Sequence, residues 1–230
     1  MKLRIGVVQI MIVFIIVVMA FVFYGAVKGK GFEDFLTYDI VDNTDGYLTI
    51  ESNKISFDHV IDNTVTYVIR EAESIGDFTH DFEFKISEID YLAATGIWGL
   101  SKSDNTKSLR HAYSYDNGGG CLYAYVYRFE NEQEEQVVQF RVREFNDNPQ
   151  GAQLIAFNIE ENTPYYARII RQGDLLIVQL FTSPSRGMDS YYDAEMKQVS
   201  TRTYEYILPF TSRGQDATES TTGYVANLRI

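Results

Sequence analysis

Residues 78–86 read FTHDFEFKI, and this short stretch decides the fold class. Phe82, Phe84 and Ile86 occupy alternate positions, and polar residues stand between them. Because successive side chains of a β-strand point to opposite faces, a period of two predicts a strand with one buried face. The stretch EQVVQFRVREF at 135–145 repeats the pattern, so the signal is not confined to one segment.

Similar short runs rich in Val, Ile, Tyr and Phe extend over most of the chain beyond Gly31. They occupy residues 65–71, 95–101, 121–129, 165–171, 175–183 and 203–208. Turn residues separate them, as at 42–46, 116–120, 146–149 and 172–174. This spacing predicts an all-β domain at 31–230, an antiparallel two-sheet sandwich of about a dozen strands.

The first thirty residues have a different composition. Residues 5–27 carry Gln9 and the phenol of Tyr24 as their only polar side-chain groups, and basic residues flank both ends. Twenty-three helical residues at about 1.5 Å each span roughly 34 Å, enough to cross a hydrocarbon layer of about 30 Å. We therefore expect residues 1–30 to form a membrane anchor with one transmembrane helix.

A cleaved signal peptide is the alternative, although its apolar core would normally be shorter than this one. Beyond Gly31 the chain has 32 Asp and Glu against 16 Lys and Arg. With Lys2 and Arg4 beside the N-terminus, this favours a single-pass protein with an extracytoplasmic C-terminal domain.

The net charge and the cysteine content argue against nucleic-acid binding, an internal disulfide and a cysteine-based zinc site. A net charge of −12 disfavours nucleic-acid binding, which needs Lys and Arg along the phosphate backbone. The one cysteine, Cys121, has no partner within the chain for a disulfide, and a zinc site built from several cysteines is excluded as well.

Three stretches carry a family resemblance: Gly76–Phe84, Tyr166–Asp174 and Gly223–Ile230. They resemble a strand, a hairpin and the closing strand of concanavalin A-like lectin/glucanase jelly rolls, particularly the laminin-G-like group. The resemblance covers about residues 35–230 and implies a jelly-roll sandwich. It also implies binding of a glycan or protein ligand, often with calcium, and glycoside hydrolysis in some branches. One fold hosts many functions, so these stretches indicate architecture rather than chemistry.

The Glu88-Ile89-Asp90 stretch resembles part of the catalytic strand of laminarinase-type glycosidases on this fold, which carry a second glutamate two or three residues after the aspartate. A retaining enzyme needs both, because it uses two carboxyl groups about 5–5.5 Å apart. Leu92 and Ala93 stand where that glutamate belongs. We therefore expect no catalytic activity, with Glu88 and Asp90 ending a strand, and keep a diverged glycosidase as an alternative.

Calcium is a candidate cofactor. Asp42, Asn43 and Asp45 offer several oxygen ligands within a few residues, which suits a hard cation, although Asx-rich segments are commonly ordinary turns. No other cofactor is predicted.

The clearest binding signal is a tyrosine row. Tyr123, Tyr125 and Tyr127 share one face of the run at 121–129, and Leu122, Ala124 and Val126 share the other. If the aliphatic face is buried, the tyrosines line the outer surface of a sheet, where rings with a polar tip suit sugars or protein partners. Gln139, Arg141 and Arg143 would supply hydrogen bonds from the next long strand. The alternative is that neighbouring strands or a loop cover these rings.

These observations predict a membrane-anchored cell-surface jelly roll that binds a glycan or another surface ligand without catalysis. A structural surface or filament subunit, which would self-associate, is the second reading.

Overall fold

A computed structural model describes residues 31–41, 46–62, 65–104, 108–109, 120–145, 154–187, 191–214 and 218–230, with the backbone alone at 191–196. The predicted anchor at 5–27 lies outside these residues. Within the described ranges, no helix has the length and apolarity needed to cross a bilayer.

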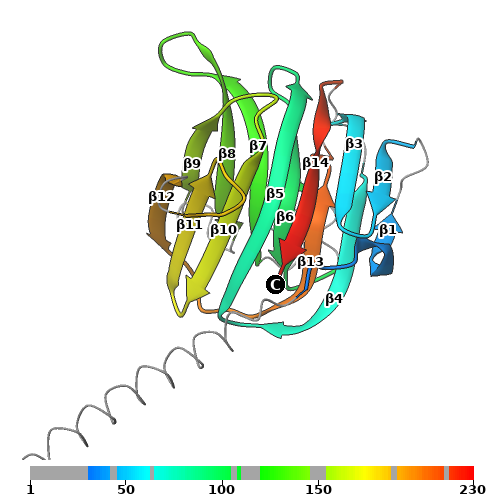
Figure 1. Ribbon diagram of the computed structural model, residues 1–230, viewed down its shortest axis with the longest axis vertical. Helices are drawn as coiled ribbons and strands as arrows, with labels where there is room; N and C mark the ends of the chain where they lie inside the picture. Colours follow the sequence, from blue (N-terminus) through cyan, green and yellow to red (C-terminus); the bar gives the residue numbers. More distant parts are fainter. Residues whose placement is uncertain are drawn as a thin grey trace, which may run out of the picture. The chain divides into compact units, whose positions relative to one another are not determined.

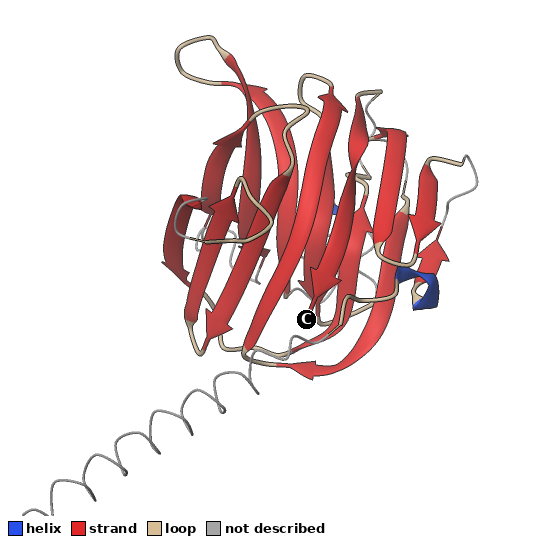
Figure 2. Cartoon of the chain, in the orientation of Figure 1, coloured by secondary structure: helices blue, strands red, loops and turns tan. Residues whose placement is uncertain are grey.

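Fourteen strands in two seven-stranded sheets make up the described part of the chain (Figure 1; Figure 2). A short 3-10 helix, η1 (Phe35–Thr37), precedes them. Sheet A has the spatial order β1 (Asp39–Val41), β4 (Tyr67–Ile75), β13 (Tyr204–Thr211), β6 (Ala94–Ser101), β7 (Cys121–Glu130), β8 (Gln136–Phe145) and β9 (Leu154–Ile159). Sheet B has the order β12 (Tyr191–Gln198), β11 (Leu175–Phe181), β10 (Tyr165–Gln172), β5 (Phe78–Ile89), β14 (Ser220–Arg229), β3 (Lys54–Ile61) and β2 (Leu48–Glu51). The predicted all-β, two-sheet antiparallel architecture is confirmed.

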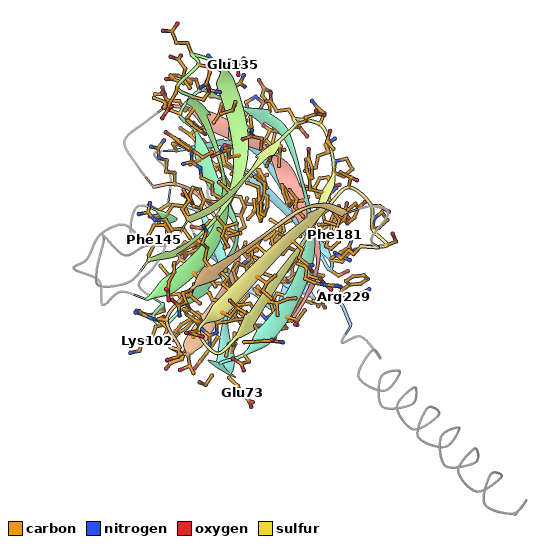
Figure 3. All side chains as sticks on the ribbon, turned by 90° about the vertical axis from the view of Figure 1, so that its left-hand side faces the viewer. Glu73, Lys102, Glu135, Phe145, Phe181 and Arg229 are labelled. Atoms are coloured by element: carbon orange, nitrogen blue, oxygen red, sulfur yellow. The ribbon has the colours of Figure 1, made fainter. Side chains whose placement is uncertain are left out.

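The main core lies between the two sheets, which Figure 3 shows as separate layers. Phe82 and Phe84 of β5 are fully buried, as the alternation in 78–86 predicts. The ring of Phe84 lies 5.0 Å from that of Phe140 on β8, so aromatic contacts join sheet B to sheet A. His80 shares the buried face of β5, and its Nδ1 lies 3.2 Å from the Trp98 indole Nε1, which donates to it.

The three stretches that carry the family resemblance lie side by side at the centre of sheet B. They fall in β10, β5 and β14, which are consecutive in the sheet. Arg168 of β10 makes a two-pronged hydrogen bond to Asp81 of β5, at 2.8 and 3.2 Å. Gly173, whose φ is +61°, opens the two-residue turn between β10 and β11, where a positive φ is required, and its N–H donates to Asp77.

Sheet A is covered on its outer face as well, which is the face directed away from sheet B. A second hydrophobic cluster there includes Leu109, Tyr123, Tyr125, Phe145 and Leu208. Every residue of β6 is buried, because this central strand lies between the main core and the second cluster. Sheet A is therefore a middle layer over part of its area, and an open surface elsewhere.

Candidate functional site

The open part of sheet A carries a stack of two aromatic rings and a guanidinium. Tyr127 and Phe129 are two residues apart on β7, so both side chains lie on the outer face. Their rings are nearly parallel, with a 3° interplanar angle and centroids 5.6 Å apart. The Arg141 guanidinium carbon on β8 lies 4.7 Å from the Tyr127 centroid and 4.5 Å from the Phe129 centroid. All three side chains are partly exposed.

A row of polar side chains continues from this stack across β8 to β9. Arg141 Nε donates to Gln139 Oε1 at 2.9 Å, and Gln139 Nε2 donates to Asn158 Oδ1 at 2.9 Å. We call Tyr127, Phe129, Gln139, Arg141 and Asn158 the outer platform. It combines ring surfaces with amide and guanidinium groups, the mixture that small-molecule sites use to set orientation.

A buried acid borders the platform. Arg213, which follows β13, lies with its guanidinium carbon 6.0 Å from the Tyr127 centroid, and its Nη1 donates to Asp62 Oδ2 at 2.8 Å and to the Leu92 carbonyl. Asp62 is 1% exposed. Desolvation raises the pKa of Asp62 to about 6, although the neighbouring Arg213 opposes the shift. Asp62 therefore changes charge just below neutral pH, next to the platform.

The structure brings all six predicted ligand-binding residues together. The pairing of β7 with β8 places Tyr123 opposite Arg143, Tyr125 opposite Arg141, and Tyr127 opposite Gln139. The aliphatic residues Leu122, Ala124 and Val126 belong to the main core, so the two faces of β7 are assigned correctly.

The prediction that the whole tyrosine row is open to solvent is wrong. Tyr123 is 0% exposed and Tyr125 is 3% exposed, because both belong to the second hydrophobic cluster. Their cross-strand neighbours on β6 are Gly99 and Gly96, whose missing side chains leave room for the rings. Burial raises the pKa of the Tyr123 phenol well above its ordinary value. Only Tyr127 of the row reaches the platform.

The sequence analysis missed two members of the outer platform and the ion pair that borders it. Phe129 has the same parity as the tyrosines, so the alternation already contained its signal. Asn158 lies on β9, opposite Gln139 in the sheet register, and this pairing has no local sequence mark. Asp62 and Arg213 are 151 residues apart in the sequence, so no spacing rule would have joined them.

The predicted calcium ligands Asp42, Asn43 and Asp45 lie outside the described residues. Within the described ranges, no group of three or more His, Cys, Asp or Glu side chains is arranged to hold a metal ion.

Glu88 and Asp90 lie at the end of β5 on sheet B. Asp90 Oδ2 accepts hydrogen bonds from the Ser220 backbone N–H at 2.7 Å and from its hydroxyl at 2.9 Å, so it ties β5 to β14. Glu88 is exposed, with its carboxylate 4.0 Å from the His59 ring. The predicted strand end is confirmed, and neither carboxylate belongs to the platform on sheet A.

The sequence matches no family of known proteins and no curated protein. Solved structures match it in shape. A functionally unknown protein from Saccharomyces cerevisiae has a TM-score of 0.55 at 10% identity, over 85% of this chain and 96% of that one. A GH43 protein from Bacillus licheniformis has a TM-score of 0.52 at 10% identity, over 87% of this chain and 39% of that one. A legume lectin-like domain from Entamoeba histolytica has a TM-score of 0.48 at 10% identity, over 85% of this chain and 94% of that one.

The chain shares its overall fold with the Saccharomyces cerevisiae and Bacillus licheniformis structures. The two-sheet sandwich that the resemblance of the three stretches in β5, β10 and β14 implies is confirmed by the strand order. At about 10% identity the likeness extends to the fold alone.

Proposed function

We propose that this protein is a non-catalytic glycan-binding protein and that the outer platform is its binding surface. One observation carries the proposal: two partly exposed rings and an arginine form a preorganised stack beside a row of amide groups. Sugars present both C–H faces and hydroxyl groups, so a platform with rings and hydrogen-bonding groups is complementary to them.

The binding mechanism follows from the layout of the platform. The exposed parts of Tyr127 and Phe129 would pack against a sugar face, and Gln139, Arg141 and Asn158 would bond its hydroxyls. Because one hydrogen bond along β8 and one between β8 and β9 already hold these polar groups in place, little side-chain entropy is lost on binding. The buried Tyr123 and Tyr125, and Arg143 beside them, would support the platform from the adjoining part of sheet A.

A non-catalytic role is supported by the position of the candidate carboxylates. Glu88 lies on sheet B, whereas the platform lies on sheet A. Asp90 is held by Ser220 and ends the strand rather than entering a site.

We further propose that residues 5–27 anchor the protein in a membrane with the acidic domain on the outer side. The proposal rests on the length of the apolar run and on the charge of the chain beyond it. Calcium at Asp42, Asn43 and Asp45 is also a proposal. A change in glycan binding on addition of EDTA, reversed by Ca²⁺, would support it, and unchanged binding would exclude a calcium requirement.

The proposed function is tested with the full chain on a glycan array, in a polyoxyethylene detergent so that no sugar headgroup competes. We expect the double variant Tyr127→Ala with Phe129→Ala to lose most of the binding. Tyr166→Ala is the matched control, because Tyr166 is a tyrosine on sheet B whose ring lies 5.6 Å from the Arg186 guanidinium. Absence of any bound glycan, or equal binding by a folded platform variant, would refute the proposal.

A further inference from the structure

Arg141, the arginine of the outer platform, differs from most of the described arginines in its pairing. Six arginines in the described part of the chain form ion pairs with a carboxylate: Arg70, Arg128, Arg168, Arg186, Arg202 and Arg213. Arg141 forms none among the described residues and is partly exposed.

The hydrogen bonds of Arg141 leave its terminal nitrogens available. Its Nε is occupied by Gln139, and the flat guanidinium group lies against the Tyr127 and Phe129 rings. Among the described residues, neither terminal nitrogen has a protein acceptor. The side chain is thus held in one orientation and retains donors for an external group.

We propose that the ligand of the outer platform is an acidic sugar and that Arg141 binds its carboxylate. This inference rests on the proposed glycan-binding function and names the class of ligand. A guanidinium offers a planar fork of N–H donors that matches a carboxylate, and such charge-assisted bonds are stronger than those to neutral hydroxyls. The ring of the sugar would then lie toward Tyr127 and Phe129, and Gln139 would bond a neighbouring hydroxyl.

Charged residues near the platform narrow the class of acidic glycan that it can bind. The hairpin between β7 and β8 carries the exposed residues Glu130, Glu132, Glu134 and Glu135, and Glu135 marks its tip in Figure 3. A dense polyanion would place several of its charges near this tip and be repelled. A single carboxylate on Arg141 makes direct charge-assisted hydrogen bonds, whereas its repulsion by exposed hairpin charges is weakened by salt. The geometry therefore points to a glycan with one terminal uronic acid rather than to a sulfated polymer.

The test compares two probes that differ in one group: a disaccharide ending in glucuronic acid and the same disaccharide ending in glucose. Binding to the full chain is measured by calorimetry in polyoxyethylene detergent. We expect the wild type to bind the acidic probe roughly ten- to a hundredfold more tightly, from the strength of charged hydrogen bonds. In Arg141→Gln the ratio of the two affinities should fall to about one, whereas Arg168→Gln on sheet B should keep the wild-type ratio.

The outcomes separate the two proposals. Equal affinity of the wild type for the two probes, or a preference that persists in Arg141→Gln, would overturn the acidic-sugar inference and leave glycan binding in place. Failure to bind any glycan on the array or either probe would overturn both. If Arg141→Gln does not fold, binding of the wild type to the methyl ester of the acidic probe is measured instead. The wild type must then lose its preference when the carboxylate is esterified, or the inference fails.

Discussion

Replacing Asp62 by asparagine should change how the stability of this protein depends on pH. Asp62 is buried beside the platform, and desolvation raises its pKa from an ordinary value of 3.8 to about 6. Its raised pKa means that the folded state binds the proton more tightly than the unfolded state. The stabilising contribution is therefore complete below pH 3.8 and is lost as the pH rises through 6.

The size of the effect follows from the two pKa values. Integrating the proton uptake between pH 7 and pH 5 gives about 1.3 kcal/mol of added stability from this one group. An asparagine side chain does not titrate in this range, so the Asp62→Asn variant should lack this gain. The change between the two pH values is the quantity to compare, because the substitution also removes the desolvation penalty and the charge that faces Arg213 at every pH.

The assay is urea unfolding of the full chain at pH 7 and at pH 5, for the wild type and for Asp62→Asn. The difference between the two proteins is the informative quantity, because all their other ionisable groups are the same. We expect the wild type to gain about 1.3 kcal/mol over the variant on acidification. A difference that stays constant across this pH range would refute the assignment of a raised pKa to Asp62.

Three further predictions concern packing. Gly99→Ala should lower the free energy of unfolding, measured in urea, by about 1–3 kcal/mol, because the new methyl group would overlap the Tyr123 ring. In the control variant Gly76→Ala the methyl group meets nothing within 4 Å, so the loss should be smaller. Equal losses in the two variants would contradict this packing. Cys121 is 2% exposed and burial raises the pKa of its thiol, so it should react with a thiol reagent only after unfolding; rapid labelling of the native protein would argue against this packing. Arg171 is 2% exposed, and its Nε and Nη1 have no hydrogen-bond partner among the described residues. Because burying this charge costs desolvation energy that these atoms do not recover, Arg171→Met should not lower the free energy of unfolding. Arg168→Met, which breaks the bond to Asp81, is the destabilising control, and a loss above about 2 kcal/mol in Arg171→Met would show that the buried guanidinium stabilises the fold.

The fold was predictable because its signals are local. Alternation over a few residues identifies β5 and β8, and one glycine with an aspartate marks the β10–β11 turn. The adjacency of β5, β10 and β14 was not predicted, because it depends on pairing between segments that are far apart in the sequence. Short edge strands such as β1 and β2 carry too few residues for a periodic signal, so the sequence left them undefined.

The site was predictable only in part, because burial depends on distant segments. The parity of β7 correctly places the tyrosines on the outer face, but their cover includes Leu109 and Leu208, which no pattern around residue 123 reveals. The position of Arg213 near Tyr127 could not be predicted either, because it depends on the pairing of β13 with β6, which is far from it in the sequence. The glycines opposite Tyr123 and Tyr125 were the available hint, since a glycine within a strand often marks a close approach.

The order of strands in sheet B has a consequence for synthesis of the protein. β5 ends at Ile89, but β14, its neighbour on one side, ends at Arg229. At about 5–20 residues per second the ribosome needs roughly 7–30 s to make the intervening chain. During that interval the edge of β5 has unpaired backbone groups that can pair with other chains. A nascent or truncated chain that lacks β14 should therefore aggregate, and co-expression of chaperones that cover that edge should improve the yield of the full chain.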